Sequence, residues 1–244
     1  RPPRSTHDQS SAASDVYKSQ RNLALAEAKG LDVMTTCATS HAIMCNTAQD
    51  MQRDPVYAST VNNLVARTSK VEYSGESQSW HLLHYLVEEI GLDKVRDAVK
   101  NPLKMNIAAY YGPDMQRDGA CAGDDPFMPT YMEQLIEALG GHPVDYDSKC
   151  MSVGSTSMLT LEDSSLAMTA AVLSDAIQSG ADLVVSACTI SHINLDSYQS
   201  KAGRVSGKRT SVPVCHLAEL VAFALGFYPD RLAQLRTRVR LIGS

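Results

Sequence analysis

The sequence predicts an α/β protein made of two tandem, pseudo-twofold related α/β modules with mostly parallel sheets. Short apolar strands alternate with helices along the chain, which is typical of parallel βαβ units. One strand–turn–helix segment also occurs twice, each time followed by a second matching helix. The chain has 244 residues, of which 44% are hydrophobic and 20% charged, so it is neither a disordered nor a fibrous chain.

The elements expected in the first hundred residues follow from local signals. Ser14 can cap a helix, and Gly30 ends it. Pro55 opens a later helix, because proline is tolerated in the first turn. The other expected elements are a short buried strand over 31–36, a helix that follows Cys37 and runs to 51, a helix over 56–68, a weak strand over 71–73, and a helix over 81–90 that Gly91 ends.

The pair Asn101-Pro102 is the expected internal boundary, because proline disfavours helix at the residue before it. It divides the chain into an N-terminal module over 1–101 and a C-terminal module over 102–244. Thr160 and Asp163 resemble a capping box at the start of a helix that ends near Gly180. The other expected elements are strands over 106–111, 143–146, 182–187 and 212–215, helices over 131–139 and 217–225, and a surface loop over 114–125.

An internal repeat carries the most information. The sequence Cys-Ala-Thr-Ser-His at 37–41 matches Cys-Thr-Ile-Ser-His at 188–192, and each follows a glycine and an apolar strand that contains an aspartate. His81 and His216 begin a second matching pair of helices, with a glycine at the same spacing after each histidine. Two matches in the same order predict a tandem duplication in which the end of a strand delivers each cysteine into a helix.

These residues resemble the family of the heterodisulfide reductase B subunit (the cysteine-rich CCG-domain family), including relatives in sulfur-oxidising complexes and in some succinate:quinone reductases. The resemblance covers nearly the whole chain. Its strongest stretches are 21–27, 30–37, 109–112, 137–140, 144–146, 194–196 and 212–214.

The resemblance implies that each module supplies a lone cysteine after a Tyr-Gly turn, a Cys-Cys-Gly triplet and a Cys-x-x-Cys turn. In the family these ligate a non-cubane 4Fe–4S cluster at which the substrate disulfide is cleaved. In the second module of this chain the lone cysteine falls on Pro113 and the triplet on Ser-Val-Gly at 152–154. The turn keeps Cys188, but Ser191 replaces its second cysteine. The chain is therefore degenerate at its cluster-ligand positions.

The first CCG-like module is incomplete in the same comparison. Cys37 remains, Ser40 replaces its partner, and the triplet falls on Arg-Pro-Pro at 1–3. We therefore expect this module to lack one strand and a lone cysteine upstream, leaving an open sheet edge or a cleft near 1–10.

The donor atoms argue against a cluster. An iron–sulfur cluster needs several thiolates, serine is a poor substitute, and proline and valine offer no donor. No cofactor is expected, and the family's 4Fe–4S cluster is the alternative. Cys37 and Cys188 are the candidate catalytic residues. They are either relics that pack as small buried hydrophobes, or reactive thiols whose pKa is lowered by a helix N-terminus and by the neighbouring His41 or His192.

The resemblance implies a component of an electron-transfer and thiol–disulfide oxidoreductase complex of sulfur metabolism, with an iron–sulfur protein like the family's C subunit and a flavoprotein like its A subunit as partners. The alternatives are persulfide or disulfide chemistry at the lone thiols, and an anchor-type subunit of a succinate:quinone reductase. A net charge of −5 argues against nucleic acid as a partner, and no apolar run is long enough to span a membrane. Six scattered cysteines favour a cytoplasmic protein with reduced thiols, which meets a membrane only through its partners.

Overall fold

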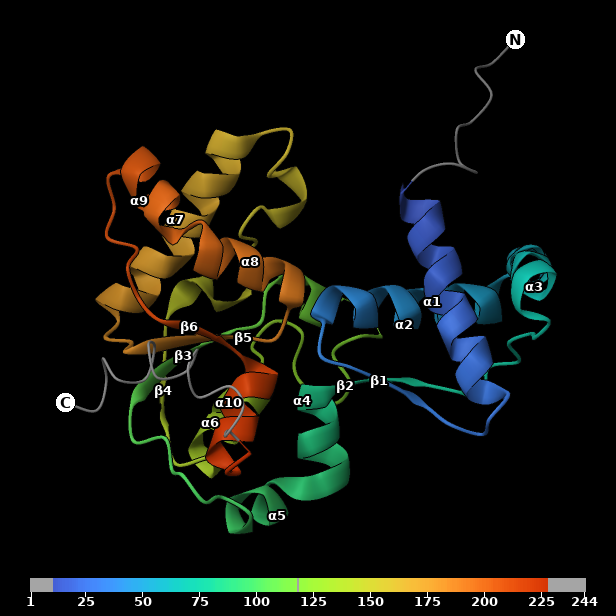
Figure 1. Cartoon of the computed structure of the whole chain (residues 1–244), viewed down its shortest axis with the longest axis horizontal. Helices are drawn as coiled ribbons and strands as arrows, with labels where there is room; N and C mark the ends of the chain where they lie inside the picture. The colour runs from blue at the N-terminus through green and yellow to red at the C-terminus, as the bar shows by residue number, and fades with distance from the viewer. Residues whose placement is uncertain (1–10, 118, 228–244) are drawn as a thin grey trace.

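The computed structural model describes residues 11–117 and 119–227 and has an α/β fold with two parallel sheets (Figure 1). The N-terminal half contains α1 (Ser11–Glu27), β1 (Val33–Thr35), α2 (Ala38–Arg53), α3 (Pro55–Ser69), β2 (Ser79–His81), α4 (Leu82–His84), a π-helical stretch η2 (Tyr85–Gly91) and α5 (Leu92–Asp97). The C-terminal half contains β3 (Asn106–Tyr110), α6 (Tyr131–Ala138), β4 (His142–Val144), α7 (Glu162–Gln178), β5 (Leu183–Ser186), α8 (Thr189–Ser197), α9 (Gln199–Ser206), β6 (Val214–His216) and α10 (Leu217–Ala224). Three 3-10 turns, η3 (Pro113–Gln116), η4 (Asp147–Cys150) and η5 (Ser155–Ser157), lie in the loops of this half. Over these ranges no helix is long and apolar enough to cross a membrane.

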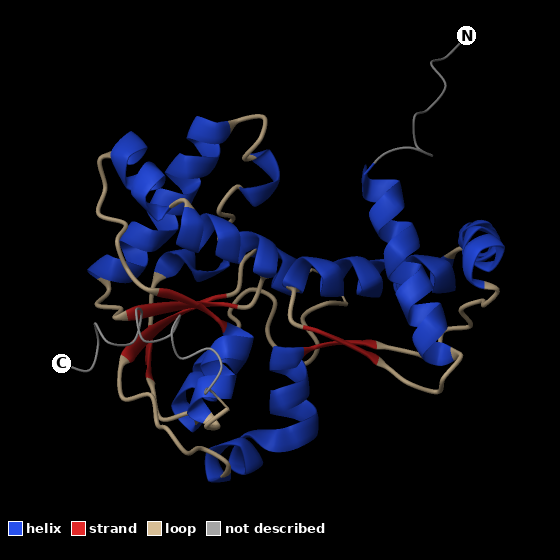
Figure 2. Ribbon diagram, in the orientation of Figure 1, coloured by secondary structure: helices blue, strands red, loops and turns tan. Residues whose placement is uncertain are grey.

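The larger sheet has four parallel strands in the order β4-β3-β5-β6. Figure 2 shows helices on both of its faces, with α7, α8 and α9 on one side and α6 and α10 on the other. Side chains alternate along β3, so Ile107 and Ala109 pack toward α6 and α10, whereas Ala108 and Tyr110 pack toward α7. Burial on both faces explains why its central strands are continuous apolar runs in the sequence.

The smaller sheet contains only β1 and β2. Helices α1, α2 and α3 form a separate core beside it, and Val33 of β1 packs there. The strand predicted over 31–36 was expected to be buried, and this was wrong. Met34 is 50% exposed, because the two-stranded sheet is covered on only one side along β1.

The segment after β2 joins the larger core. Leu83 of α4 and Val95 of α5 pack in the same cluster as Leu135 and Leu139 near α6. The hydrophobic core continues across the predicted division at 101–102, because residues from both sides of it pack in one cluster.

One predicted element of the N-terminal half differs in the structure. Residues 71–73 form no strand, because Asn62 binds both backbone groups of Tyr73: its side chain accepts from the N–H at 3.1 Å and donates to the C=O at 3.0 Å. The strand lies instead at β2, where no alternating pattern marked it. Gly91 ends the helical stretch that begins after His81, as predicted: its backbone has φ 85° and ψ 137°, and α5 begins at the next residue.

Two predictions in the C-terminal half also need correction. Thr160 and Asp163 form no capping box, because Leu161 is the N-cap residue of α7 and makes no side-chain cap bond. The loop over 114–125 is only partly a surface loop. It packs against α2 through η3 and buries Met115 and Ala120.

The repeat extends to strand register. Thr35 pairs with His81 in the smaller sheet, and Ser186 pairs with His216 in the larger one. Thr35 and Ser186 each stand two residues before the repeated cysteine. Among the described residues the smaller sheet has no counterpart of either β3 or β4, and the expected loss of one strand stays a prediction. The region 1–10, where an open edge or cleft was expected, and the Arg-Pro-Pro at 1–3 lie outside the described residues.

Candidate functional site

The two repeated cysteines meet between the sheets. Cys37 is the N-cap residue of α2 and Cys188 is the N-cap residue of α8, with nearly equal backbone angles of φ −117°, ψ 114° and φ −128°, ψ 121°. Figure 1 shows α2 and α8 meeting at their N-terminal ends near the centre of the molecule. The hydroxyl of Thr39, in the first turn of α2, lies 3.3 Å from the Cys188 sulfur, and the interaction of the two thiols lowers the pKa of Cys37 and raises that of Cys188. The sequence marked both residues as candidates but treated them as separate sites, and the structure makes them one pair.

Crosswise contacts hold the two cysteine turns together. The carbonyl of Ala187 accepts from the Ala38 N–H at 3.2 Å and from His81 Nε2 at 2.9 Å. His216 makes a looser contact with the backbone of Thr36, so its buried Nε2 lacks a well-formed hydrogen bond. Thr36 and Ala187 are equivalent in the repeat, so each histidine reaches across to the residue before the other module's cysteine. The two bonds to the Ala187 carbonyl therefore hold the cysteine turns side by side.

His81 has a positioning role through both ring nitrogens. Its Nδ1 accepts from the Leu83 N–H at 3.2 Å and caps α4, while its Nε2 donates to Ala187. Burial, with neighbouring histidines, lowers the pKa of His81 to about 3, so its ring is neutral at ordinary pH.

The surroundings distinguish the two thiols. Cys188 is 2% exposed, whereas Cys37 is partly exposed. Hydrogen bonding to Cys188 is the largest influence on the pKa of Cys37 and lowers it. Ser40 and the Thr189 backbone act in the same direction, whereas burial opposes them. The bond to Cys37 and burial both raise the pKa of Cys188.

The expected histidine partner of Cys37 is engaged elsewhere. His41 Nδ1 hydrogen-bonds the Ser79 hydroxyl at 2.9 Å, and its ring packs against His81 and His84. Backbone and hydroxyl donors at the helix N-termini, together with Cys188, therefore create the polar environment of Cys37.

Thr39 links the pair to the loop after β3. Its hydroxyl lies 3.3 Å from the Cys188 sulfur and donates to Asp114 at 2.5 Å. Asp114 is also paired with Arg117 at 2.9 Å. The Asp114 carboxylate therefore interacts with both Thr39 and Arg117, and Thr39 lies between it and the Cys188 sulfur.

Comparison with known proteins identifies the family. The chain is 31% identical to the 8-methylmenaquinol:fumarate reductase membrane anchor subunit of Wolinella succinogenes, over 84% of this chain and 72% of that protein. It is 29% identical to the B subunit of the ferredoxin:CoB-CoM heterodisulfide reductase of Methanosarcina mazei, over 87% and 71%. A protein of Archaeoglobus profundus that is named as similar to the heterodisulfide reductase B subunit is 28% identical over 87% and 73%. The chain belongs to this family of proteins like the heterodisulfide reductase B subunit.

Two further comparisons were made, one with solved structures and one with models of protein families. A crystal structure of a hypothetical protein from Helicobacter pylori superposes with a TM-score of 0.71 at 15% identity, covering 96% of this chain and 41% of that one. That likeness supports the α/β fold alone. No family model matches the chain.

Residues 152–154, on which the resemblance predicts the family's triplet, lie against the core of the C-terminal half. The Val153 side chain is 1% exposed and packs with Tyr110, and its carbonyl accepts from Thr169 Oγ1 and Asn194 Nδ2, both at 2.9 Å. The Ser152 hydroxyl accepts from the N–H two residues later at 3.1 Å. The Val153 side chain, the Val153 carbonyl and the Ser152 hydroxyl therefore all make contacts within the chain.

The resemblance also predicts ligands at Pro113 and Ser191, and both residues take part in the local structure. Pro113 begins η3 directly after Gly112, which has φ 70°. The hydroxyl of Ser191 donates to the Tyr110 hydroxyl, which in turn donates to the Met151 carbonyl at 2.9 Å. Over the described ranges, no group of three or more His, Cys, Asp or Glu side chains is arranged to hold a metal ion. Two thiols, with proline and valine at two of the ligand positions that the resemblance predicts, do not fit the donor set of a 4Fe–4S cluster.

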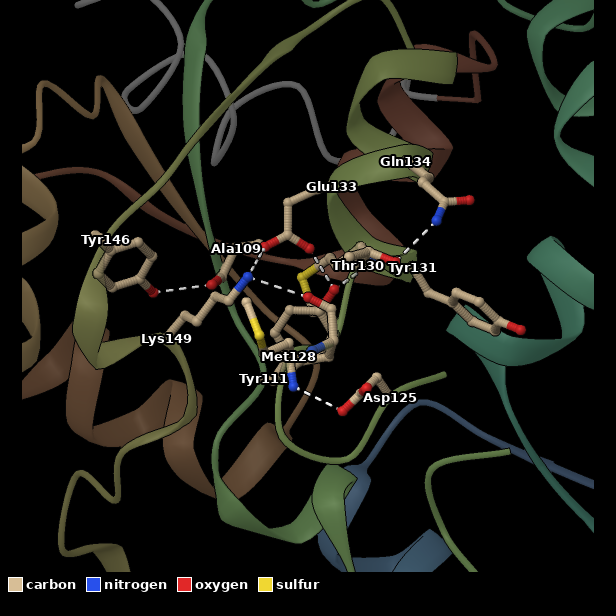
Figure 3. Close-up of polar contacts among 12 residues, drawn as sticks. Ala109, Tyr111, Asp125, Met128, Thr130, Tyr131, Glu133, Gln134, Tyr146 and Lys149 are labelled. Carbon is tan, nitrogen blue, oxygen red and sulfur yellow. Dashed lines mark hydrogen bonds and ion pairs between the residues drawn. The ribbon is translucent and has the colours of Figure 1, made fainter. Parts of the chain in front are cut away.

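A buried polar network that the sequence did not reveal supports the loop carrying Asp114 (Figure 3). The Tyr111 hydroxyl donates to the Glu133 carboxylate and accepts from the Met132 N–H at 2.7 Å. Lys149 Nζ donates to Glu133 at 2.8 Å, and the Lys149 carbonyl accepts from the Tyr111 N–H at 2.9 Å. The Tyr-Tyr-Gly end of β3 is the one signal that could have indicated it. This network joins the loop after β3 to the turn that leads to 152–154.

Proposed function

We propose that the chain is a component, like the heterodisulfide reductase B subunit, of an electron-transfer and thiol–disulfide oxidoreductase complex of sulfur metabolism, and that its cluster sites have been lost. Its relatives are by name subunits of a heterodisulfide reductase and of a fumarate reductase, which supports a role within an oxidoreductase complex.

The observation that carries the cluster-free form of this proposal is the donor set. The scaffold of the C-terminal module keeps the spacing of the family's ligand positions, yet Pro113 and Val153 have no donor atom to offer. The two remaining thiols, Cys37 and Cys188, interact with each other instead of each belonging to a cluster site of its own module. The chain would then act by assembly with an iron–sulfur protein like the family's C subunit and a flavoprotein like its A subunit, and the proposed location is the cytoplasm.

Isolation of the native complex tests the assembly. The full protein would be tagged in its host and purified anaerobically, and the co-purifying subunits would be analysed for flavin and iron. We expect a stoichiometric flavoprotein and an iron–sulfur protein. A chain that purifies alone under every condition in which the host expresses it would contradict the proposal.

An anchor-type subunit of a quinone-linked fumarate or succinate reductase is the second candidate, because the Wolinella relative of that name is 31% identical. The same isolation separates the two. A co-purifying flavoprotein that oxidises succinate or reduces fumarate supports the second candidate, whereas one that is oxidised by disulfides supports the first.

A further inference from the structure

We propose that Cys37 and Cys188 form a dithiol–disulfide exchange site, in which Cys37 attacks a substrate disulfide and Cys188 resolves the mixed disulfide. The inference deepens the proposed function and rests on it for the class of substrate. It differs from cluster chemistry because the two electrons come from the protein's own sulfur atoms.

Contact between the thiols is the first requirement, and the fold supplies it. The hydroxyl of Thr39, two residues after Cys37, lies 3.3 Å from the Cys188 sulfur although 151 positions separate the two cysteines in the chain. Each cysteine ends a strand and caps a helix, and the Ala187 carbonyl, bound by Ala38 and His81, ties the two turns together. A disulfide between them would therefore join two segments that are already held side by side.

Different exposure assigns the two roles. Cys37 is partly exposed, whereas Cys188 is 2% exposed and has the Thr39 hydroxyl against its sulfur, so Cys37 is the more accessible of the two to a disulfide in solution. A nucleophile that meets solvent and a resolving thiol beneath it is the arrangement that exchange requires. The N-termini of α2 and α8 both point at the pair, and their dipoles favour negative charge on Cys37.

The reaction balances without a metal. The Cys37 thiolate attacks one sulfur of R–S–S–R′, the substrate S–S bond breaks, a Cys37–S–S–R bond forms and R′S⁻ leaves. Cys188 then gives its proton to solvent or to the departing thiolate and attacks the Cys37 sulfur. The Cys37–Cys188 bond forms and RS⁻ leaves, so the substrate gains two electrons and the dithiol is oxidised. Two electrons and two protons from a reduced flavin or iron–sulfur partner, or from a dithiol in vitro, restore the pair.

The test follows one turnover of the full chain under anaerobic conditions. The pre-reduced protein, freed of reductant, is mixed with one equivalent of glutathione disulfide, quenched with acid, and analysed by intact mass and peptide mapping. We expect the wild-type chain to yield a Cys37–Cys188 disulfide and two glutathione molecules, with little adduct. Cys188→Ala should hold one glutathione on Cys37, and Cys37→Ala should react roughly tenfold more slowly or worse. The matched control Cys150→Ala, a partly exposed cysteine outside the pair, should behave as wild type.

The outcomes separate this inference from the proposed function. Glutathione adducts that accumulate on the wild-type chain without a Cys37–Cys188 bond would overturn it, as would an undiminished rate in Cys37→Ala. If a variant fails to fold, the peptide map of the wild-type chain alone shows whether a Cys37–Cys188 disulfide forms, and this decides the test. Iron is measured on the same samples: stoichiometric iron contradicts the cluster-free proposal itself, whereas an iron-free chain without exchange refutes only the dithiol site.

Discussion

At the scale of single residues, Cys37 shows how hydrogen-bond donors set the reactivity of a thiol. Hydrogen bonding to Cys188, helped by the donors of Ser40 and Thr189, lowers the pKa of Cys37 below that of an ordinary thiol. As pH is lowered, the rate of its alkylation by iodoacetamide should therefore fall at a lower pH than that of an unperturbed cysteine. In Cys188→Ala the strongest donor is gone, so the fall should move to higher pH. Mass spectrometry of the Cys37 peptide after timed alkylation measures both, and a wild-type midpoint near 8 or above would refute this explanation.

Packing and backbone conformation both require glycine at position 154. A Cβ at Gly154 would lie 2.8 Å from the Ser165 Cα, and its φ is 73°. Gly180 has a similar φ of 89° but nothing within 4 Å of a Cβ, so it is the matched control. Gly154→Ala should lower the free energy of unfolding by about 2–4 kcal/mol and Gly180→Ala by about 1 kcal/mol. Urea denaturation compares them, and equal losses would show that the close approach to α7 does not matter.

At the scale of elements, three buried histidines join α2 to the start of α4. The rings of His41, His81 and His84 lie with centroids 5.7–5.9 Å apart. Burial is the main cause that lowers the pKa of His41 to about 4, and of His81 and His84 to about 3. Below pH 6.5 the unfolded chain takes up protons that the folded chain does not, so stability present at pH 7 is lost as pH falls.

The measurable consequence is a slope of stability against pH. Between pH 6.5 and 5 the free energy of unfolding should fall, and each histidine contributes at most about 1.4 kcal/mol per pH unit. His84→Gln should reduce the slope, whereas replacing the exposed His142 by Gln should leave it unchanged. Urea titrations at several pH values give the slopes, and equal slopes for wild type and His84→Gln would exclude the buried cluster as their origin.

The network in Figure 3 predicts an unequal pair of tyrosine substitutions. Tyr111→Phe removes the donor to Glu133 and leaves the buried Met132 N–H without its acceptor, so it should cost about 1–3 kcal/mol. Tyr131→Phe removes only an exposed bond of 3.0 Å to Glu88 and should cost less than about 0.5 kcal/mol. Thermal and urea unfolding of both variants measure the difference. Similar costs would mean that the network adds little to stability.

At the scale of the whole molecule, the repeat was predictable from the sequence, whereas the arrangement of its two copies relative to each other was not. The strands at 106–110 and 183–186 were predictable because both faces are buried and their residues are apolar. The strand at 79–81, with the residues Ser-Trp-His, has no such pattern, and only its equivalence to 214–216 could have indicated it. Contact between Cys37 and Cys188 was not predictable, because a repeat specifies each copy and not the interface between them.

The same limit applies to the residues around the thiols. The sequence named His41 as the neighbour that would lower the pKa of Cys37, because it follows four positions later on the same helix. The structure turns His41 toward Ser79 and brings Ser40 and Thr189 to the sulfur instead. Thr189 comes from the other copy, so only the assembled fold could reveal it.

We propose that this member of the family of proteins like the heterodisulfide reductase B subunit carries a thiol pair and no iron–sulfur cluster. The most direct test is the iron and acid-labile sulfide content of the anaerobically purified chain, read together with its visible absorption spectrum. We expect no stoichiometric iron and no visible iron–sulfur absorption, with both unchanged by Cys188→Ser. Stoichiometric iron with cluster absorption that disappears in Cys188→Ser would contradict the claim.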